Sequence, residues 1–360
     1  MIVNCVGQSC DCGALARLMI TEVIIIVNYS YPLISMSARN QLELITYRKE
    51  GAHVSQDTVQ EFENAIASGN VKRKELGPFS AFLGSLFHKL VIRRKLPLFP
   101  ALAPKKDKDR LCILMGLEFH KPFVPFLFNK SNHVYFFDAW PGNHGEMEQF
   151  IRVLNVRNVF FSSGQVTEIF KKKNLPCRFH WLSEGISLTD YSSKPYPDKD
   201  IEVLSFGRKY DWLHEKIEEG LHRSKITYLY EKRRGEIIFK DRAGFIDGLA
   251  RTKISICVPS NITHPERAGE ISTMTVRYLQ SMASKALIVG IMPKDMEGLF
   301  DYDPMIALDM TDPLAQIKHI LENYSSYIPL IERNYNYISQ HHTWANRWSD
   351  LQRILQEDRA

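Results

Sequence analysis

The chain has 360 residues, of which 44% are hydrophobic and 24% are charged, and its formal net charge is +5. This balance is typical of a globular protein and excludes a wholly disordered or collagen-like chain. The excess positive charge is local, because residues 71–110 contain eleven Lys or Arg and only three Asp or Glu. A local basic segment favours an anionic partner, and the rest of the chain lacks the basic excess of a typical DNA-binding protein. We therefore expect no nucleic-acid partner.

The most apolar stretch of the chain lies at residues 14–27. It is too short for a transmembrane helix and contains Arg17 and Glu22. It also lacks the basic start and the cleavage site of a signal peptide, so we expect a cytoplasmic protein. A more ordinary sequence begins at Met36. We interpret residues 1–35 either as a flexible or non-native extension or as an integral part of the protein.

Short β-rich segments alternate with helical patterns along the rest of the chain. The first half predicts strands at 42–48, 111–116, 133–138, 158–163 and 177–182. Its predicted helices span 57–68, 79–95, 144–154 and 164–173. The second half predicts strands at 201–207, 226–230, 236–239, 254–259, 286–291 and 305–309. Its predicted helices span 209–221, 243–251, 273–284, 312–323, 325–340 and 343–356.

Near-continuous apolar strands that alternate with helices indicate parallel sheets covered on both faces. Two such series predict an α/β protein with two Rossmann-like, doubly wound domains that face a cleft. The polar segment 187–200 contains two prolines and is the predicted linker. The predicted N-terminal domain is therefore 36–186, and the predicted C-terminal domain is 201–342.

The densest group of chemically active side chains lies in the second half. Ser272, Thr273 and Thr275 place hydroxyls near the expected start of helix 273–284, and Arg277 follows. Free backbone N–H groups and the positive end of the helix dipole lie at such a start, so the segment suits a bound diphosphate. Alternatively, Ser272 or Thr273 only caps the helix and Arg277 forms a surface ion pair.

This segment resembles the GT-B glycosyltransferases, specifically the glycosyl transferases group 1 and the CgeB-like proteins related to spore maturation. In this family an acidic loop leads to a helix with the pattern Thr-x-Arg, followed by Tyr or Thr, then by Phe or Leu, and then by Glu. The matching residues here are Thr275, Arg277, Tyr278 and Leu279, with Gln280 at the Glu position. The chain end resembles the closing helix of the family through His341, His342, Thr343, Trp344 and Arg347. The resemblance implies that the last segment, 343–360, crosses back to brace the N-terminal domain.

The resemblance implies a hexosyltransferase-type enzyme whose C-terminal domain binds a nucleotide-diphosphate sugar and whose N-terminal domain binds the acceptor. The implied donor-binding residues are Gly207, Arg208, His264, Ser272, Thr273, Thr275, Arg277 and Gln280. A glycine would let the backbone approach the diphosphate, and a glutamine can hydrogen-bond ribose hydroxyls. Retaining members of the class carry two glutamates eight positions apart, but Ser272 and Gln280 stand at those positions here. The stereochemistry therefore stays open.

The candidate catalytic residues are Asp138, Glu266 and Glu270. The two glutamates lie in the loop before the predicted diphosphate helix, where they contact the donor sugar or only solvent. Asp138 ends a predicted strand, where it serves as the base of an inverting reaction or only shapes the following turn. Glu184 and Gly185 lie at the domain junction, where they are expected to face the cleft or to form a hinge.

Such a reaction needs no metal and no cofactor, since helix-dipole amides and arginines can stabilise a leaving diphosphate. We expect a glycan or lipid-linked acceptor in the synthesis of a surface polysaccharide of the cell envelope. One alternative is transfer of glycerophosphate or a polyol phosphate by the same fold. Another is a non-enzymatic assembly protein that binds a nucleotide sugar. This alternative is favoured by Gln280, which stands where the family has Glu.

The basic segment begins with apolar residues at helical spacing, among them Phe79 and Phe82. Basic side chains cluster at its end, within residues 89–95. One interpretation is peripheral contact with an anionic membrane through these residues, at the inner face of the membrane. The other is a helix whose apolar face packs on the N-terminal sheet.

Overall fold

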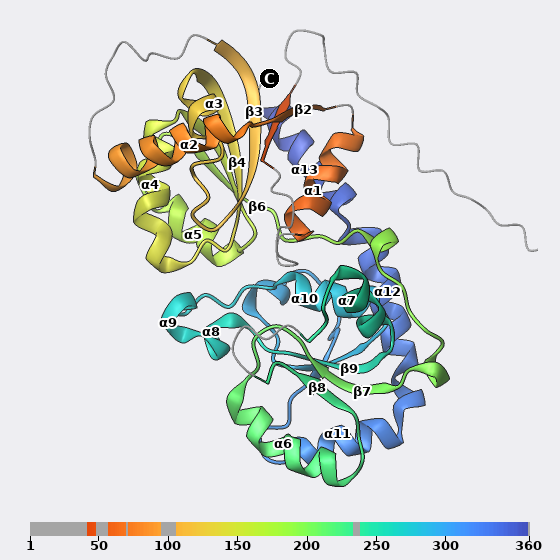
Figure 1. Cartoon of the computed structure of the whole chain (residues 1–360). Helices are drawn as coiled ribbons and strands as arrows, with labels where there is room; N and C mark the ends of the chain where they lie inside the picture. The colour runs from red at the N-terminus through yellow and green to blue at the C-terminus, as the bar shows by residue number, and fades with distance from the viewer. Residues whose placement is uncertain (1–41, 48–56, 70, 95–105, 233–237, 359–360) are drawn as a thin grey trace, which may run out of the picture. The chain divides into compact units, whose positions relative to one another are not determined.

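Two parallel β-sheets, each flanked by helices, form the framework of the protein (Figure 1). The computed structural model describes residues 42–47, 57–69, 71–94, 106–232 and 238–358. The segment 1–35, interpreted above as an extension or an integral part, lies outside the described residues. The two sheets confirm the predicted α/β class with two Rossmann-like domains.

The first sheet has the strand order β2-β1-β3-β4-β5-β6, and all neighbouring strands are parallel. Its strands are β1 (Glu43–Thr46), β2 (Lys72–Glu75), β3 (Lys106–Met115), β4 (Asn129–Phe137), β5 (Val156–Phe161) and β6 (Arg178–Trp181). The helices of this half are α1 (Asp57–Ser68), α2 (Pro78–Phe87), α3 (Phe123–Leu127), α4 (His144–Val153) and α5 (Gly164–Lys171). The apolar runs of β4 and β5 are buried on both faces, which is why they form central strands.

The second sheet has the order β11-β10-β9-β7-β8 and is also parallel throughout. Its strands are β7 (Ile201–Ser205), β8 (Tyr228–Tyr230), β9 (Thr252–Cys257), β10 (Leu287–Gly290) and β11 (Ile306–Ala307). The helices of this half begin with α6 (Asp211–Arg223), α7 (Arg242–Ala250), α8 (Ser260–Thr263), α9 (Pro265–Ala268) and α10 (Val276–Ala283). They end with α11 (Pro313–Glu322), α12 (Ile328–His341) and α13 (Trp344–Glu357). From β7 the chain adds β8 on one side, and then adds β9, β10 and β11 on the other side. The carboxyl ends of β7 and β9 therefore flank the topological switch point.

Three sequence predictions need correction, and one strand was missed. Residues 238 and 239 of the predicted strand 236–239 form bends, and the other two lie outside the described residues. β2 was not predicted, because its sequence KRKE has no apolar alternation and it forms only by pairing with β1. The predicted helix 79–95 divides into α2 and a π-helical turn, η2 (His88–Arg93). Finally, α10 begins at Val276, three residues after the predicted start at 273, because contacts of Ser272 that are described below hold the preceding residues extended.

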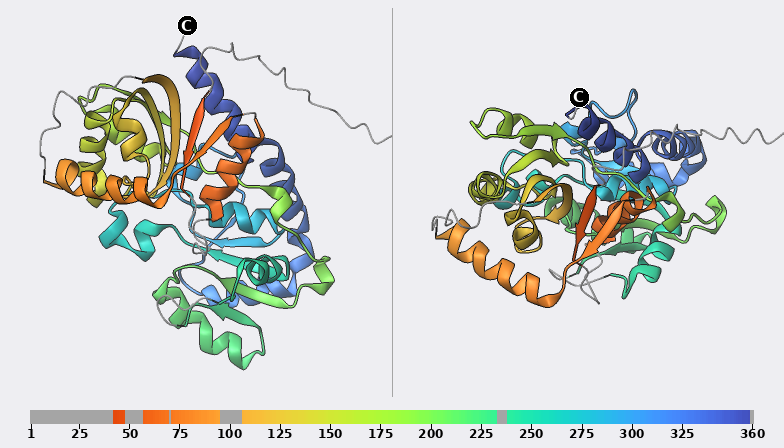
Figure 2. Two further views of the ribbon diagram at one scale, coloured as in Figure 1. Left: turned by 45° about the horizontal axis from the view of Figure 1, so that its top comes forward. Right: turned by 90° about the horizontal axis from the view of Figure 1, so that it is seen from above.

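The closing helix α13 packs on the N-terminal domain beside α1, as the resemblance implied (Figure 2). The indole of Trp344 is buried, stacks on the ring of Phe62 at a centroid distance of 4.5 Å and meets Phe137 edge-on. Thr343 and Asn346 form a capping box that fixes the start of the helix. α13 therefore belongs to the hydrophobic core of the first sheet although it follows the second sheet in sequence.

No strand is present between the end of β6 at Trp181 and the start of β7 at Ile201, a stretch that includes the predicted linker. The domain limits given above remain predictions. In the part of the chain that the structure describes, no helix combines the length and the apolarity that crossing a lipid bilayer requires.

Candidate functional site

Arg277 lies at the carboxyl ends of the two central strands of the second sheet. Its guanidinium donates hydrogen bonds to the carbonyl oxygens of Phe206 (3.4 Å) and Val258 (3.1 Å), which follow β7 and β9. Gly207 has a φ of +73°, and a Cβ atom there would come within 3.2 Å of the Arg277 side chain. A side chain at Gly207 would therefore be strained and would crowd this arginine. The guanidinium thus occupies the switch point, where ligands of open α/β sheets bind.

The start of α10 adds hydroxyl groups that have no partner. Thr275 is the N-cap residue, yet its side chain makes no capping hydrogen bond. The hydroxyl oxygens of Thr273 and Thr275 are both buried and have no hydrogen-bond partner among the described residues. Buried hydroxyls without partners are rare, and a bound group would explain them. An anion is the natural candidate, because the helix N-terminus presents backbone N–H groups and positive charge.

Asp138 brings a carboxylate of the first domain to the second. It follows β4 with a φ of +46°, uncommon for a residue other than glycine. Its carboxylate accepts a hydrogen bond from Arg267 of α9 at 3.2 Å, and that guanidinium also lies over the Trp140 ring at 5.0 Å. Burial raises the pKa of Asp138, while the charges of Arg267 and Arg208 lower it.

Glu184 places a second carboxylate at the same location. It follows β6 and is 6% exposed. Burial and the charge of Asp138 raise the pKa of Glu184 to about 8, against the opposing effects of the Val276 N–H and the Arg277 charge. Two carboxylates and the guanidinium groups of Arg208, Arg267 and Arg277 therefore influence one another here.

The structure ties two other predicted donor-binding residues to the protein itself. Ser272 accepts a hydrogen bond from Lys294 N at 3.2 Å, and its carbonyl accepts one from Asp295 N. These contacts hold the segment extended, which delays the start of α10. Gln280 is buried and donates to the hydroxyl of Tyr191 at 2.9 Å. Their roles toward a donor remain predictions.

The three predicted residues of the loop before α10 are His264, Glu266 and Glu270, and they lie at the edge of the candidate site. His264 is half-buried and its Nδ1 lies 2.9 Å from the Thr263 hydroxyl. Glu266 and Glu270 are exposed, and within the described part of the chain they form no hydrogen bond or ion pair through their side chains. The structure therefore brings Asp138, Arg208 and Arg277 together but leaves the two loop glutamates outside their contacts.

The sequence analysis missed a buried polar network beside the site. Glu61 of α1 accepts hydrogen bonds from the Tyr191 hydroxyl (3.1 Å), from Arg242 (2.9 Å) and from the Trp344 indole (3.3 Å). Through Tyr191 it also connects to Gln280 of α10. The network joins α1, α7, α10 and α13, and its members are too far apart in sequence for any local pattern to predict it.

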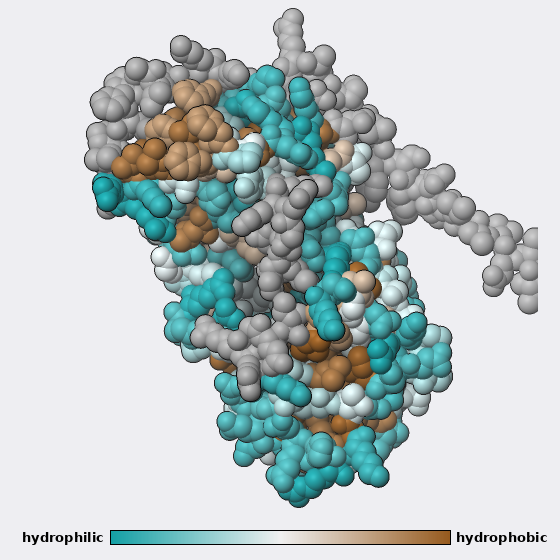
Figure 3. All heavy atoms as spheres, viewed as in Figure 1, coloured by the Kyte–Doolittle hydropathy of each residue, from teal (hydrophilic) through white to brown (hydrophobic). Residues whose placement is uncertain are grey.

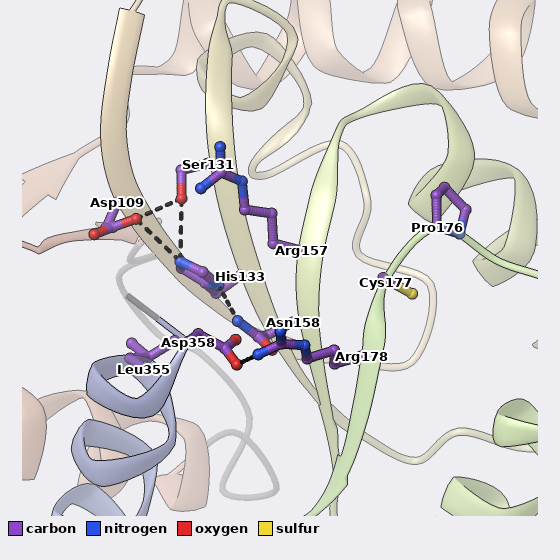
Figure 4. Close-up of a pocket in the computed structure, with 10 residues that line it drawn as sticks. All are labelled: Asp109, Ser131, His133, Arg157, Asn158, Pro176, Cys177, Arg178, Leu355 and Asp358. Carbon is purple, nitrogen blue, oxygen red and sulfur yellow. Dashed lines mark hydrogen bonds and ion pairs between the residues drawn. The ribbon is translucent and has the colours of Figure 1, made fainter. Parts of the chain in front are cut away.

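A separate cavity of about 380 Å³ lies at the opposite edge of the first sheet, at the amino ends of its strands (Figure 4). A hydrogen-bonded chain crosses its floor, from His180 through Asn158 (2.9 Å) to His133 (3.2 Å) and on to Asp109 (3.3 Å). None of the residues predicted for the site lines this cavity. The candidate site is therefore the one at the carboxyl ends of β7 and β9.

No protein-family model and no curated protein sequence matches this chain. Its fold does match solved structures. Sucrose-phosphate synthase from Thermosynechococcus elongatus aligns with 89% of this chain and 99% of its own length, with a TM-score of 0.54 and 10% identity. Anabaena HepE in complex with UDP-glucose aligns over 88% and 99%, with a TM-score of 0.54 and 8% identity.

A glycosyltransferase from Rickettsia africae aligns with 88% of this chain and 98% of its own length, with a TM-score of 0.51 and 10% identity. At such identities the likeness is one of fold. The chain therefore has the GT-B fold, two Rossmann-like domains, that these glycosyltransferases share.

Proposed function

We propose that the protein is a glycosyltransferase that moves a sugar from a nucleotide-diphosphate sugar to a glycan or lipid-linked acceptor. One observation carries the proposal: Arg277, the start of α10 and the unpartnered hydroxyls of Thr273 and Thr275 all lie together at the switch point of a GT-B fold. A diphosphate matches this combination of positive charge and hydrogen-bond donors. The similar Anabaena structure, a UDP-glucose complex, supports a donor of this class.

Each group has a proposed part in the transfer. The N–H groups at the start of α10, together with Arg277 and Arg208, stabilise the diphosphate as it leaves, so a metal is not needed for this step. Asp138 takes the proton from the attacking acceptor hydroxyl, as in an inverting reaction. Glu266, Glu270 and His264 lie toward the donor sugar, and Gln280 toward the ribose.

We also propose that α2 brings the enzyme to the inner face of an anionic membrane, where lipid-linked precursors of a surface polysaccharide reside. The side chains of Phe79 and Phe82 are 73% and 67% exposed, and hydrophobic residues gather over α2 and α3 in Figure 3. The exposed basic residues Arg93 and Arg94 follow them, whereas Lys95 lies outside the described residues. Apolar side chains next to cations suit an anionic lipid surface.

The alternative, a helix whose apolar face packs on the N-terminal sheet, holds only in part: Phe87 and Leu90 pack against the core, but Phe79 and Phe82 do not. The contact of the helix with the domain also uses a different face. Gly84 is buried, and a Cβ atom there would lie only 2.1 Å from the carbonyl oxygen of His120. The small residues Ala81 and Gly84 therefore face the domain, and the phenylalanines remain available to a partner.

Ligand-induced stabilisation tests the proposed donor site. Melting curves would be recorded with UDP, GDP, CDP, ADP and their sugar conjugates, with and without magnesium. A ligand at a hundred times its Kd adds about 2.7 kcal/mol of stability, which gives a visible shift. We expect one nucleotide to stabilise the wild-type protein and the exposed control Arg353→Ala without magnesium, but not Arg277→Ala. No shift with any nucleotide in the folded protein would contradict the proposal.

Turnover then separates the proposed transfer from its alternatives. Consumption of a sugar nucleotide with acceptors present supports glycosyl transfer, whereas consumption of CDP-linked glycerol alone supports glycerophosphate transfer. Binding without turnover of any donor would favour the non-enzymatic assembly protein, for which the one sequence argument is Gln280.

A further inference from the structure

Ser272, three residues before the N-cap residue Thr275 of α10, is held by the first domain as well as by its own. Gln165 is the second residue of α5, and its side-chain amide contacts the main chain of Ser272. The amide nitrogen Nε2 donates to the Ser272 carbonyl oxygen at 2.9 Å, and the Ser272 N–H donates to the amide oxygen Oε1 over a longer distance of 3.5 Å. A carboxamide can both donate and accept, so one side chain serves both main-chain groups of Ser272.

Asp295 of the second domain holds Gln165 in turn. Its buried carboxylate accepts hydrogen bonds from the Ser163 hydroxyl (2.6 Å), from the Gln165 main-chain N–H (3.2 Å) and from the Gln165 Nε2 (3.3 Å). The carboxylate therefore lies at the start of α5, where a negative charge is favoured. Because the Gln165 amide nitrogen has two acceptors, Ser272 and Asp295, the orientation of the amide group is fixed.

The sequence Ser163-Gly164-Gln165 suits this contact between the domains. It follows β5 directly, at the carboxyl end of the first sheet, which is the end where ligands of such sheets bind. A Cβ atom at Gly164 would lie 3.1 Å from the Trp181 ring and 3.3 Å from the Asp295 carboxylate. A larger residue at this position would therefore push the carboxylate away from the start of α5.

The segment that Gln165 holds leads into the proposed diphosphate site. The buried hydroxyls of Thr273 and Thr275, which directly follow Ser272 or lie close behind it, have no hydrogen-bond partner among the described residues. We propose that Gln165 is a positioning residue for the donor: by fixing Ser272 it presents these two hydroxyls and the start of α10 to the diphosphate. This inference rests on the proposed function, because it assumes that the diphosphate binds at α10.

The physical reason is preorganisation. A segment that is already held in its binding conformation does not have to be ordered when the ligand arrives, so less of the interaction free energy is lost. The first domain therefore contributes to donor affinity through Ser272, without itself contacting the diphosphate. The alternative is that Gln165 only joins the two domains. Its loss would then lower the stability of the protein and leave the affinity for a nucleotide unchanged.

Calorimetric titration with UDP, or with whichever nucleoside diphosphate the melting panel selects, separates these two roles. Gln165→Leu keeps a side chain of similar size but makes no hydrogen bond. We expect it to bind the nucleotide about tenfold more weakly than the wild type, the effect of one or two lost hydrogen bonds. The control Gln352→Leu changes a half-buried glutamine of α13 that forms no side-chain hydrogen bond within the described part of the chain, and it should bind as the wild type. Melting temperatures without nucleotide report stability separately.

A second variant tests whether the hydrogen bonds of Gln165 are the cause. Gln165→Glu keeps the shape of the side chain, but its ionised carboxylate cannot donate to Ser272 and meets the negative charge of Asp295. Once protonated, the introduced carboxyl group can donate again, and the Asp295 charge raises its pKa. We expect its affinity to be close to that of the wild type at pH 5.5 and at least about tenfold lower at pH 8. The wild type is measured at both pH values, because the terminal phosphate titrates near pH 6.

The possible outcomes are distinct. Wild-type affinity in Gln165→Leu overturns the inference while the proposed donor site stands, and a lower melting temperature would then assign Gln165 to the joining of the domains alone. A ratio of Gln165→Glu to wild-type affinity that is the same at both pH values also overturns it. If the wild type binds no nucleotide, the proposed function fails and the inference with it. Should Gln165→Leu not fold, the pH dependence of Gln165→Glu decides alone.

Discussion

The guanidinium of Arg267 lies 3.2 Å from the carboxylate of Asp138 and donates a hydrogen bond to it. Arg267 belongs to the short helix α9 of the second domain, and Asp138 follows β4 of the first. The pair therefore joins the two domains beside the candidate site. Its energetic effect is moderate, because the Arg267 side chain is 42% exposed and solvent screens the charge.

The ion pair with Arg267 affects the pKa of Asp138, the proposed catalytic base. Arg267 lowers the pKa of Asp138, so Arg267→Gln should raise it. If the ionised Asp138 takes the proton from the acceptor hydroxyl, the acid limb of the kcat/KM profile should move to higher pH in Arg267→Gln. The shift should be about half a pH unit, because the lost ion pair is partly exposed. Arg353→Ala should leave the limb in place. An unmoved limb in Arg267→Gln, with Asp138→Asn still active, would remove Asp138 from the mechanism.

The apolar surface of α2 predicts measurable membrane binding. We expect the protein to sediment with vesicles that contain anionic lipid, and Phe79→Ser with Phe82→Ser to weaken this by tenfold or more, since a buried Phe contributes roughly 1.5–3 kcal/mol. Arg93→Glu with Arg94→Glu should weaken it similarly, because each basic residue contributes about 1 kcal/mol near such a surface. Met310→Ser, 48% exposed in the other domain, is the control. Equal sedimentation of all variants would refute the docking surface.

The closing helix should be required for folding. A chain that ends at Gln340 lacks Trp344, which is 1% exposed in the core of the first domain. We expect this truncation to be insoluble or unfolded by circular dichroism. The milder change Trp344→Ala should lower the free energy of unfolding by about 3–5 kcal/mol in urea titrations. A truncated chain that folds and melts like the full protein would contradict the bracing role of α13.

The alternating strands and helices could be predicted from the sequence because they depend on local hydrophobic patterns and helix caps. The predicted helix 57–68 has the bounds observed for α1. The predicted helix 164–173 begins at the first residue of α5, where Ser163 accepts a hydrogen bond from Val166 N. β2 and the start of α10 could not be predicted. β2 depends on pairing with β1, and the delay of α10 depends on contacts of Ser272 with residues more than twenty positions away.

The same distinction applies to the candidate site. Arg277 and Gly207 were predicted from the pattern of a strand end and a helix start, together with the family resemblance. Their contact, across seventy residues, could come only from the fold. Glu184 was noted as a residue of the domain junction, but its burial and the contact of its carbonyl oxygen with Arg347 of α13 have no local signal.

His342 gives the closing motif a structural role that can be tested by pH. Its Nδ1 accepts a hydrogen bond from Arg347, and its Nε2 lies 3.1 Å from the carbonyl oxygen of Leu299, to which it donates. The ring is therefore neutral in the folded protein. Burial, followed by the charge of Arg347, lowers the pKa of His342 to about 3.

This shift makes the protein less stable in acid. An unfolded histidine has a pKa of about 6.5, so between pH 6.5 and 3 the unfolded chain binds a proton that the folded chain does not. The contribution of His342 to stability is complete above pH 6.5 and is lost at about 1.4 kcal/mol per pH unit as the pH falls. A glutamine there can still accept from Arg347 and donate to Leu299, but it does not titrate.

We therefore expect the free energy of unfolding, from urea titrations at pH 6.5, 5.5 and 4.5, to fall less steeply in His342→Gln than in the wild type. The difference should approach 1.4 kcal/mol per pH unit. His341→Gln, a change at the exposed neighbouring residue, should keep the wild-type slope. Parallel curves for His342→Gln and the wild type would mean that another group, such as the half-buried His180, whose pKa burial lowers to about 4, causes the acid sensitivity.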